Sequence, residues 1–541
     1  MGALKYKTDV VIIGGGIAGI TCALELLDSN IKVVLIDRDD KENFGGLAKE
    51  SFGGMFFVDT PHQRKLGIKD SIDIATRDWF SFAEFNEDDL WQKKWAEKYI
   101  HQCRDDVYFW LRDRSINFFP IVHWVERGLH QPGNSYPRFH MIWGTGYELS
   151  NVLIKHLEAH KNAENLTLLF NHKGEEFIAA DGWVNGMTGI DESNGTTFEI
   201  EADHIVVATG GISGNIEKVK ENWYKPWGSP PEVILNGSHQ YALGEFHDRI
   251  SDINGKVCHL DKMWNYAAGI HHHRPKHKLH GLSIIPPKSA IWINSQGKRI
   301  GPIPLISGFD TRFLVAQVCR QEKKYSWQVM NMRIAIKEMA ISGSEFNKTI
   351  REKNWIGFII SALMGNKSLV NELVSENQDV ITANSIEELA EKMNHLTGTN
   401  EVNIDMLKES ILNYDQNIDR GRKYFNDEQL MRLSYLRQYR GDRVRTCKFQ
   451  KIDDKKAYPL LAIREFILSR KTLGGIQTDL HCRVLLDNER ANETIPGLYA
   501  IGEAAGFGGG GMHGKRSLEG TFLGGCILTG RVAAKTIIEN H

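Results

Sequence analysis

The sequence predicts an α/β fold in which a Rossmann-like dinucleotide-binding domain carries an inserted α+β capping domain. Three observations lead to this prediction. A strand, a glycine turn, a helix and a second strand follow one another between Asp9 and Asp37. Apolar strands that end in glycines return at His204–Gly211 and Ile495–Gly502. The long segment between these two returns is rich in helical patterns, as expected of an insertion into a parallel sheet.

The first unit has the pattern of a turn built around a pyrophosphate. Gly14 permits the tight turn, Gly16 lets the backbone approach the phosphates, and Gly19 lets helix and strand pack closely. The helix predicted over Ile17–Leu27 offers free N–H groups and the positive end of its dipole at its N-terminus. Asp37 ends the second strand, where a carboxylate can bind a ribose hydroxyl and would repel a 2′-phosphate.

Length and composition narrow the class of protein. A chain of 541 residues predicts two or three domains. A hydrophobic fraction of 41% is that of a globular protein, and a net charge of −2 gives no sign of a nucleic-acid partner. The seven cysteines include no Cys-x-x-Cys pair, which argues against a redox-active disulfide, a c-type haem and an iron–sulfur module. Free thiols suit a reducing cytosol.

The sequence also carries no recognisable targeting or membrane segment. The first nine residues lead into the first strand without an apolar signal segment, and Tyr6 breaks the myristoylation pattern. The sequence contains no run of 18 apolar residues, so no transmembrane helix is predicted. We therefore expect a cytoplasmic protein without an integral membrane segment.

Two Gly-Gly pairs, Gly45-Gly46 and Gly53-Gly54, flank a short segment after the first unit. Backbone that lies against a large planar ligand needs this composition, because a Cβ atom would hold it away. An ordinary surface loop is the alternative interpretation.

Residues 60–147 are predicted to form a helical insertion rich in tryptophan and phenylalanine. Apolar residues at helical spacing predict helices over Ser71–Phe85, Asp88–His101 and Asp105–Arg114. The aromatic side chains either pack in the core of this insertion or form a wall for an apolar ligand, and the pattern leaves both open. His140, in turn-forming sequence near the end of the insertion, is a candidate site residue.

A helix over Glu148–His160 and then a small antiparallel layer are predicted next. An Asn-Gly pair at 194–195 is a hairpin signal within that layer. The predicted strands are Leu166–Phe170, Glu176–Ala180, Trp183–Gly189 and Thr197–Glu201.

The capping domain is predicted over residues 269–465, between two parts of the dinucleotide-binding domain, 1–268 and 466–541. A hairpin is predicted over Ile291–Ile300, and the helical, charged segment 314–440 suits a mobile, solvent-facing cap. Five histidines near its start lack helical i, i+4 spacing, and Pro275 interrupts them, so no metal site is predicted. They are His271, His272, His273, His277 and His280. A last helix is predicted from Phe522 to Glu539.

The glycine turn, the Ala-Thr-Gly-Gly run at 208–211 and the Gly-Leu-Tyr-Ala-Ile-Gly-Glu run at 497–503 form a set. This set resembles flavoproteins with a glutathione-reductase-like dinucleotide fold. Within them, essentially the whole chain is similar to the group of fumarate reductases and 3-ketosteroid dehydrogenases. The resemblance implies FAD as cofactor. It also implies hydride exchange between flavin N5 and a CH–CH bond next to a carbonyl or carboxylate.

The resemblance further implies which residues hold FAD. The three glycines of the first turn would hold the pyrophosphate, Asp37 the ribose, Glu503 the ribityl hydroxyls, and Gly525 the pyrimidine end. Leu47–Ser51 contains no histidine, so the flavin is expected to bind non-covalently. The full predicted set is Gly14, Gly16, Ala18, Gly19, Asp37, Arg38, Gly45, Gly46, Leu47, Ala48, Ser51, Gly53, Gly54, Thr209, Gly210, Gly211, Gly502, Glu503 and Gly525.

Catalytic candidates come from the same resemblance. Fumarate reductases carry a Thr-Arg pair, which Arg312 with Thr311 matches, and a His-Gly-x-x-Arg run, which 513–516 resembles with Arg516 one residue closer. Lys471 replaces the histidine of their His-Thr-Met-Gly-Gly run, so fumarate is expected to be a poor substrate. The resemblance implies that Arg312 transfers the proton, whereas Arg516 and Lys471 polarise the carbonyl. His140 is an alternative relay, and Tyr458 is a loose match to the tyrosines of ketosteroid dehydrogenases.

Three functions compete at this stage. They are an FAD-dependent dehydrogenase or reductase, an FAD-dependent oxidase or monooxygenase, and a flavin-binding protein without turnover. No second GxGxxG follows a strand, so a quinone or a carrier protein is expected to exchange electrons with the flavin. The small-molecule substrate is not determined, although the aromatic insertion is compatible with a bulky, steroid-like compound.

Overall fold

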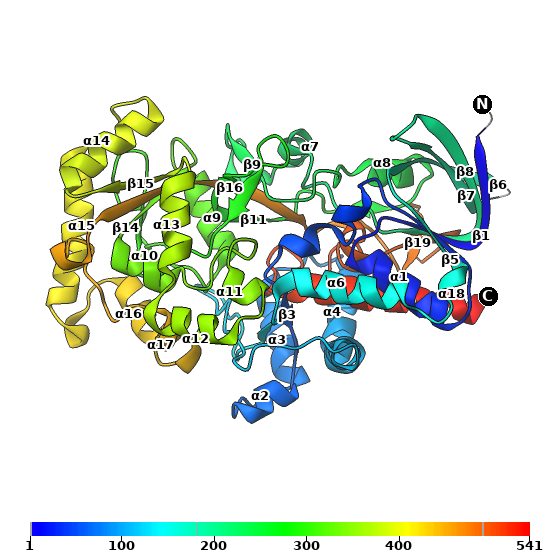
Figure 1. Ribbon diagram of the computed structural model, residues 1–541, viewed down its shortest axis with the longest axis horizontal. Helices are drawn as coiled ribbons and strands as arrows, with labels where there is room; N and C mark the ends of the chain where they lie inside the picture. Colours follow the sequence, from blue (N-terminus) through cyan, green and yellow to red (C-terminus); the bar gives the residue numbers. More distant parts are fainter. Residues whose placement is uncertain (1–2, 181, 489–491) are drawn as a thin grey trace.

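Two sheets organise the chain, and each has its own apolar core (Figure 1). The computed structural model describes residues 3–180, 182–488 and 492–541. Figure 1 shows both termini in one half of an elongated molecule and the helices of the cap in the other half. The predicted α/β fold with an inserted α+β part is confirmed.

The first sheet has a parallel centre formed by the predicted βαβ unit. Strand β1 (Leu4–Ile13) pairs in parallel with β2 (Val33–Ile36) and with β8 (Thr196–Val207). The last four residues of β1 and of β8 and all of β2 are buried, as expected for a parallel sheet covered on both faces. Helices α1 (Ile17–Asp28), α6 (Thr145–Glu158) and α18 (Thr521–Asn540) pack together beside it. The full order is β18–β19–β8–β1–β2–β5, with β5 at Leu166–Leu169, β18 at Arg483–Leu485 and β19 at Thr494–Ala500.

The predicted antiparallel layer forms from three of its four strands, because the first of them, β5 at Leu166–Leu169, instead pairs in parallel with β2. Strands β6 (His172–Ala180) and β7 (Trp183–Asp191) continue the sheet from the outer half of β8. The β7–β8 turn contains Gly195 at φ +76°, a backbone conformation that the Asn-Gly pair favours.

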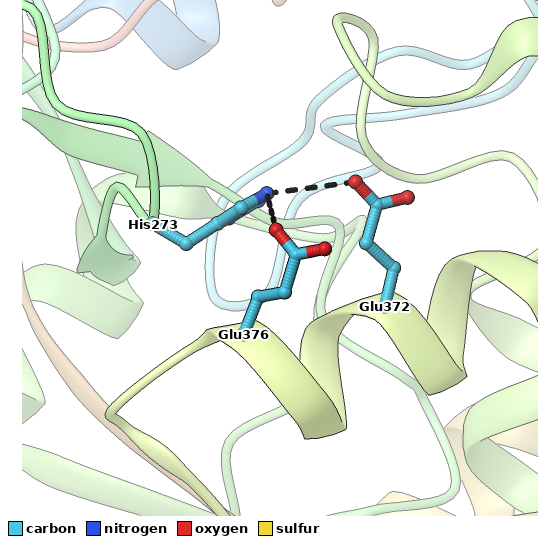
Figure 2. Close-up of side chains that lie close together, drawn as sticks. All are labelled: His273, Glu372 and Glu376. Atoms are coloured by element: carbon cyan, nitrogen blue, oxygen red, sulfur yellow. Dashed lines mark ion pairs between the residues drawn. The ribbon is translucent and has the colours of Figure 1, made fainter.

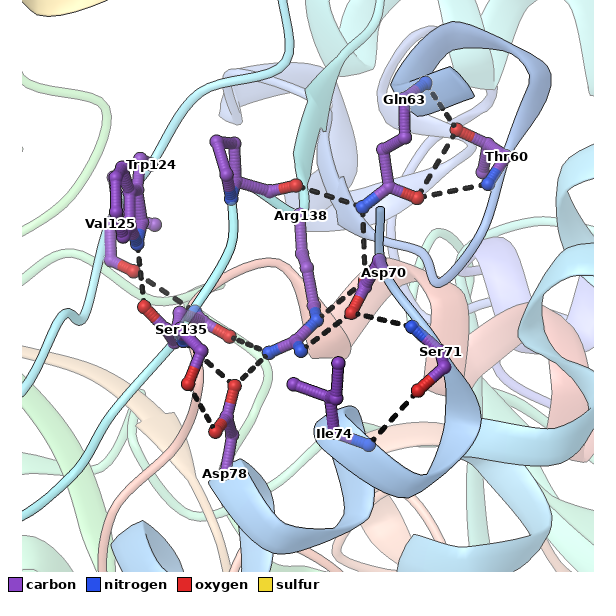
Figure 3. Close-up of polar contacts among 12 residues, drawn as sticks. Thr60, Gln63, Asp70, Ser71, Ile74, Asp78, Trp124, Val125, Ser135 and Arg138 are labelled. Atoms are coloured by element: carbon purple, nitrogen blue, oxygen red, sulfur yellow. Dashed lines mark hydrogen bonds and ion pairs between the residues drawn. The ribbon is translucent and has the colours of Figure 1, made fainter. Parts of the chain in front are cut away.

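The helical insertion packs on the core of the first sheet. Trp79, Trp95 and Tyr99 are fully buried there, so most of its aromatic residues serve core packing. Figure 3 shows Arg138, itself fully buried, held at 2.8 Å from Asp70 and 2.7 Å from Asp78. This network lies beside the two-stranded antiparallel sheet of β3 (Gly54–Phe56) and β4 (Phe139–Met141), two strands that are far apart in the sequence. The elements are β3 (Gly54–Phe56), α2 (Pro61–Lys65), α3 (Ile72–Ala83), α4 (Leu90–Gln102), α5 (Trp110–Asp113) and β4 (Phe139–Met141).

The second sheet is built around β16 (Leu460–Thr472), in the order β12–β11–β16–β14–β13 with β9 and β15 also paired to β16. Because β9, β11 and β16 lie outside 269–465 or cross its ends, this sheet spans the predicted domain boundaries, which stay a prediction. The other strands are β9 (Ile234–Asn236), β10 (Val257–Cys258), β11 (Met263–His271), β12 (Gly281–Ser283), β13 (Ile291–Ile293), β14 (Ser326–Asn331), β15 (Val380–Ala383) and β17 (Gly475–Ile476).

Helices surround this second sheet, as the composition predicted for the cap. The helices that precede the cap are α7 (Ile216–Glu221) and α8 (Glu245–Asp252). Those of the cap are α9 (Thr311–Cys319), α10 (Met332–Glu338), α11 (Lys348–Arg351), α12 (Trp355–Met364), α13 (Lys367–Glu376), α14 (Ile386–Thr397), α15 (Ile404–Asp419), α16 (Glu428–Leu436) and α17 (Arg440–Arg445).

Helix α18 is long and apolar enough to meet the length and composition of a membrane span. Of the most apolar 18-residue stretch of this helix, 67% is buried inside the fold, where the helix packs on α1. Its apolar composition is therefore explained by its position in the core.

Candidate active site

A large pocket of about 450 Å³ lies between the carboxyl edge of the first sheet, the helical insertion and the cap. The wall at one end includes the glycine turn and Asp37, whereas Lys288, Trp292 and Thr311 line it from the cap. In open α/β sheets, ligands bind outside the carboxyl ends of the strands, which is where this pocket lies.

The first glycine turn leaves room for a phosphate group. A Cβ atom on Gly14, whose φ is +109°, would lie 2.5 Å from the carbonyl oxygen of Ala208. A Cβ on Gly19 would collide with the carbonyl oxygen of Gly14, so helix and strand touch there. A Cβ on Gly16, the N-cap of α1, would meet nothing within 4 Å. The turn is therefore packed from behind and open in front, as a pyrophosphate requires.

The Asp37 carboxylate stabilises the glycine turn and still has free hydrogen-bond acceptor sites for a ligand. Its carboxylate accepts hydrogen bonds from the backbone N–H groups of Gly15, at 2.7 Å, and Asp39, at 2.8 Å. An ionised carboxylate accepts about four hydrogen bonds, so acceptor sites remain for ribose hydroxyls. Burial raises the pKa of Asp37 above its usual value. The neighbouring Arg38 pairs with Glu192 at 2.9 Å.

The other predicted glycine segments gather beside this turn. The Gly45 N–H donates to the Gly15 carbonyl at 3.0 Å, which places the Gly45-Gly46 pair against the first turn. At the other end of the same wall, the Glu503 carboxylate accepts from the backbone N–H of Thr472 at 2.8 Å. Burial raises the pKa of Glu503 to about 7. The residues present thus fit a dinucleotide with a ring system that extends toward the cap.

The predicted cofactor residues divide into a wall and a support. The wall includes Gly14, Gly16, Ala18, Asp37, Arg38, Gly45, Gly46, Leu47, Ala48, Ser51, Gly53, Gly54, Thr209, Gly210, Gly502 and Glu503. Gly19, Gly211 and Gly525 lie behind it and do not line the pocket, and Gly19 packs helix against strand as the sequence predicts. A Cβ on Gly211 would collide with Thr472, and one on Gly525 would lie 2.9 Å from Met512, so these glycines permit close packing.

Lys471 lies on the pocket wall with two partners that the sequence analysis did not identify. Its ammonium group donates to the Tyr266 hydroxyl at 3.0 Å, and that hydroxyl donates to Glu519 at 3.0 Å. The indole of Trp264 donates to the other oxygen of Glu519 at 2.7 Å. Burial lowers the pKa of Lys471 to about 8 and raises that of Tyr266 well above its usual range. Tyr266, Lys471 and Glu519 all line the pocket.

The cap end of the pocket is also charged. Lys288 lines it, and burial lowers the pKa of this lysine to about 8. His123 lines it too, and neither of its buried ring nitrogens has a hydrogen-bond partner among the described residues. Glu126 accepts from the backbone N–H of Thr311 at 3.0 Å, and burial raises its pKa to about 8. This end therefore offers donors to a polar group on a ligand.

Arg312 and Arg516 lie at the junction of the two halves but do not line the pocket. The Arg312 guanidinium donates to the Lys515 carbonyl at 3.2 Å and lies over the rings of Tyr224 and Trp227. Arg516 forms ion pairs with Glu84 and, at 3.2 Å, with Asp310. The two arginine segments meet across the domains, but their partners here are protein groups. Their predicted chemical roles stay untested.

His140 and Tyr458 lie away from the pocket, which corrects their placement. Strand β4 directs Phe139 and Met141 toward the pocket, so His140 between them faces the core, where it bonds to Thr60 at 2.8 Å. Burial lowers the pKa of His140 to about 3. Tyr458 directly precedes the start of β16, whereas Lys471 lies near the end of this strand. At the rise per residue of an extended strand, the two residues are roughly 40 Å apart. Its hydroxyl bonds to Asp453 at 2.5 Å.

The histidine-rich segment of the cap brings one histidine to two carboxylates (Figure 2). His273 lies 3.7 Å from Glu372 and 4.0 Å from Glu376, which are one turn apart on α13. Arg274 also pairs with Glu372 at 3.1 Å and with Glu376 at 3.0 Å. Because this guanidinium already neutralises the carboxylates, we propose no metal there.

The residues that sequence reasoning missed have weak local signals. Tyr266 is one of two residues of the Phe, Trp and Tyr class between 263 and 272, and only the pairing of β11 with β16 brings it to Lys471. Glu519 had the one available sequence signal of a site residue, because it is an acid between a glycine-rich loop and the final helix.

Comparison with known proteins identifies the family. The FAD binding domain family matches residues 9–523. The chain belongs to this FAD-binding family. A relative from Mycobacterium tuberculosis, named a KsdD-like steroid dehydrogenase, is 37% identical over 552 aligned positions, which cover 98% of this chain and 96% of that protein.

Solved structures agree on the fold. A flavocytochrome c3 fumarate reductase in an open conformation has a TM-score of 0.67 at 18% identity and covers 99% of this chain and 78% of its own. The 3-ketosteroid delta1-dehydrogenase of Sterolibacterium denitrificans also has a TM-score of 0.67, at 16% identity, with 99% and 100% coverage.

The family and the relatives decide among the three functions. The chain is an FAD-dependent oxidoreductase, a dehydrogenase or reductase that acts on a carbon–carbon bond. Nothing in these comparisons favours the oxidase or monooxygenase alternative.

Proposed function

We propose that the substrate is an apolar, steroid-like ketone that is oxidised at the carbon–carbon bond beside its carbonyl group. The observation that carries this proposal is the polar cluster of Tyr266, Lys471 and Glu519 in the pocket wall, next to the apolar ring of Phe522, whose centre lies 4.1 Å from the Lys471 ammonium group. The name of the 37% identical relative supports the same substrate class. The donors at the cap end suit a polar group at the far end of such a molecule.

FAD is held in this proposal by the wall residues of the glycine turns, by Asp37 and by Glu503. When bound, FAD accepts the hydride from the substrate carbon. Non-covalent binding is proposed because the segment Leu47–Ser51 offers no histidine. Acid precipitation of the purified yellow protein should release all of the flavin as FAD, and colour that stays with the pellet would contradict this.

Tyr266, Lys471 and Glu519 have separate roles in this proposal. Lys471 uses one of its three donors on Tyr266 and keeps the others for the substrate oxygen, which it polarises. Tyr266 takes the proton from the substrate carbon as it gives its own hydroxyl proton to Glu519. This concerted transfer avoids a free phenolate, which burial makes costly.

The test is anaerobic mixing of the FAD-loaded protein with a 3-ketosteroid while flavin absorbance is followed. We expect bleaching in the wild type, and a rate ~10²–10⁴ lower in Tyr266→Phe at unchanged flavin content, the usual size of a lost acid–base group. Tyr458→Phe is the matched control and should keep the wild-type rate. Bleaching by fumarate-type dicarboxylates but by no ketosteroid would overturn the substrate class.

The electron partner and compartment belong to the same proposal. A quinone or a carrier protein exchanges electrons with the flavin, because no second glycine fingerprint follows a strand. A reducing, cytoplasmic compartment is supported by the seven cysteines, all of which are free thiols.

A further inference from the structure

Helix α12 presents an apolar stripe to solvent. Its sequence, WIGFIISALM, contains no charged residue. Five side chains recur at i, i+3, i+4, i+7 and i+8, the spacing of one helix face, and each is 52–77% exposed. They are Ile356, Ile359, Ile360, Leu363 and Met364. A surface helix normally turns such a stripe toward the core, and an exposed apolar patch marks an interaction site.

The opposite face of α12 is firmly anchored. Trp355 stacks on Trp143 with ring centres 4.0 Å apart, and Phe358 contacts Phe119 at 4.9 Å. The Lys337 ammonium group bonds to the carbonyls of Ala362 and Leu363 at the C-terminus of the helix. The stripe is therefore held outward by packing on its other side. Figure 1 shows α12 along one edge of the cap, beside α11 and α17.

Exposed cations lie on the helices next to this stripe. Lys348 on α11, Lys367 on α13, and Arg440 with Arg443 on α17 are exposed. Within the described part of the chain, none of these four forms an ion pair with a carboxylate. Helices α11 and α17 contact α12, and α13 follows it after two residues. The only exposed acid between 348 and 367 is Glu352. An exposed apolar stripe is thus combined with positive charge on the neighbouring helices.

We propose that the cap docks on the surface of an anionic lipid bilayer through α12. The stripe would enter the boundary between headgroups and acyl chains, while the four cations meet lipid phosphates. A helix of ten residues is only about 15 Å long, half of the ~30 Å hydrocarbon core, so it lies in the interface and does not span.

A second copy of the chain fits this surface less well. A standard interface buries ~800 Å² on each partner, far more than five side chains of one helix offer. A symmetric contact would also bring the four cations of each copy together, whereas an anionic surface neutralises them. The docking proposal does not depend on the identity of the substrate.

The test is sedimentation of the FAD-loaded protein with phosphatidylcholine vesicles that contain or lack phosphatidylglycerol. We expect binding to the anionic vesicles at low salt, ~10-fold tighter than to phosphatidylcholine alone and weakened by salt. The combined variant Ile356→Gln, Ile360→Gln, Leu363→Gln should lose binding. Lys348→Glu with Lys367→Glu should lose the preference for anionic lipid.

A matched control makes the same kind of change on α15, where Met406 and Leu412 are 40% and 37% exposed. Met406→Gln with Leu412→Gln should bind as the wild type does, and flavin content verifies folding of every variant. Wild-type protein that stays in solution with both vesicles, or an α12 variant that binds equally, would overturn the proposal. So would a wild-type dimer in analytical ultracentrifugation that the α12 variant loses without any vesicle binding.

Discussion

Lys471 is a buried ammonium group in a pocket wall, and its protonation sets a limit on activity. Burial lowers its pKa to about 8, so the charged form that polarises the substrate is lost as the pH rises through that value. We expect the rate of flavin reduction by a ketosteroid to fall above pH 8. In Lys471→Arg this alkaline limb should move upward, because the guanidinium stays protonated. An alkaline limb that is the same in both proteins would assign it to another group.

Asp37 acts at the opposite end of the pocket. Asp37→Ala removes the acceptors proposed for ribose and the bonds to Gly15 and Asp39 that hold the turn. We expect FAD affinity to fall by ~1–3 kcal/mol, the cost of leaving buried partners unpaired. Asp37→Asn keeps one acceptor oxygen and should lose less. Titration of the apoprotein by flavin fluorescence measures both, and equal affinities in all three proteins would remove Asp37 from the site.

The βαβ unit shows how glycines in one element serve different purposes. Gly19→Ala places a Cβ against the Gly14 carbonyl, so we expect the apoprotein to lose ~1–3 kcal/mol of stability. Gly16→Ala places a Cβ in open space at the N-cap of α1, so the apoprotein should stay within ~0.5 kcal/mol of wild type.

For cofactor binding we expect the reverse order, with the larger loss in Gly16→Ala and the smaller loss in Gly19→Ala. Gly16→Ala should be purified without flavin, because its Cβ fills the space proposed for the pyrophosphate. Thermal unfolding of the apoproteins and the ratio of flavin to protein check the two effects. A flavin-loaded Gly16→Ala protein would place the phosphates elsewhere.

At the scale of the whole molecule, Arg516 ties the glycine-rich loop of one half to the cap. Its ion pair with Asp310 is mostly buried, and Asp310 also caps α9 by accepting from the Phe313 N–H at 2.9 Å. In a double-mutant cycle of Arg516→Gln with Asp310→Asn, which leaves a capping oxygen, we expect a coupling energy of ~0.5–3 kcal/mol in chemical unfolding. Additive effects would show that the pair does not join the halves.

That cycle also tests the catalytic hypothesis for Arg516. If the arginine only joins the domains, Arg516→Gln should lower stability and leave the reduction rate at saturating substrate near that of wild type. A large loss of rate with intact stability would restore its predicted role at the substrate.

Local chemistry made much of the fold and of the cofactor wall predictable. The glycine turn, the buried strands and Asp37 follow one another within a single βαβ unit, so their spacing in the sequence is nearly their spacing in space. The Gly45–Gly54 segment and the Glu503 turn were identified by composition and resemblance, and most of their residues line the pocket. Helices and strands with strong periodicity were placed within a few residues.

The substrate end of the pocket depends on contacts between distant segments. Lys471, Tyr266 and Glu519 come from β16, β11 and the loop before α18, and only the register of the second sheet and the packing of α18 bring them together. The sidedness of His140 and the remoteness of Tyr458 are equally tertiary properties, since one depends on the pleat of β4 and the other on the direction of β16. The sequence by itself determined an FAD-binding α/β fold, because its signals are local. Only the tertiary structure decided which ionisable groups face the pocket, because side-chain direction depends on the pairing of strands far apart in the chain.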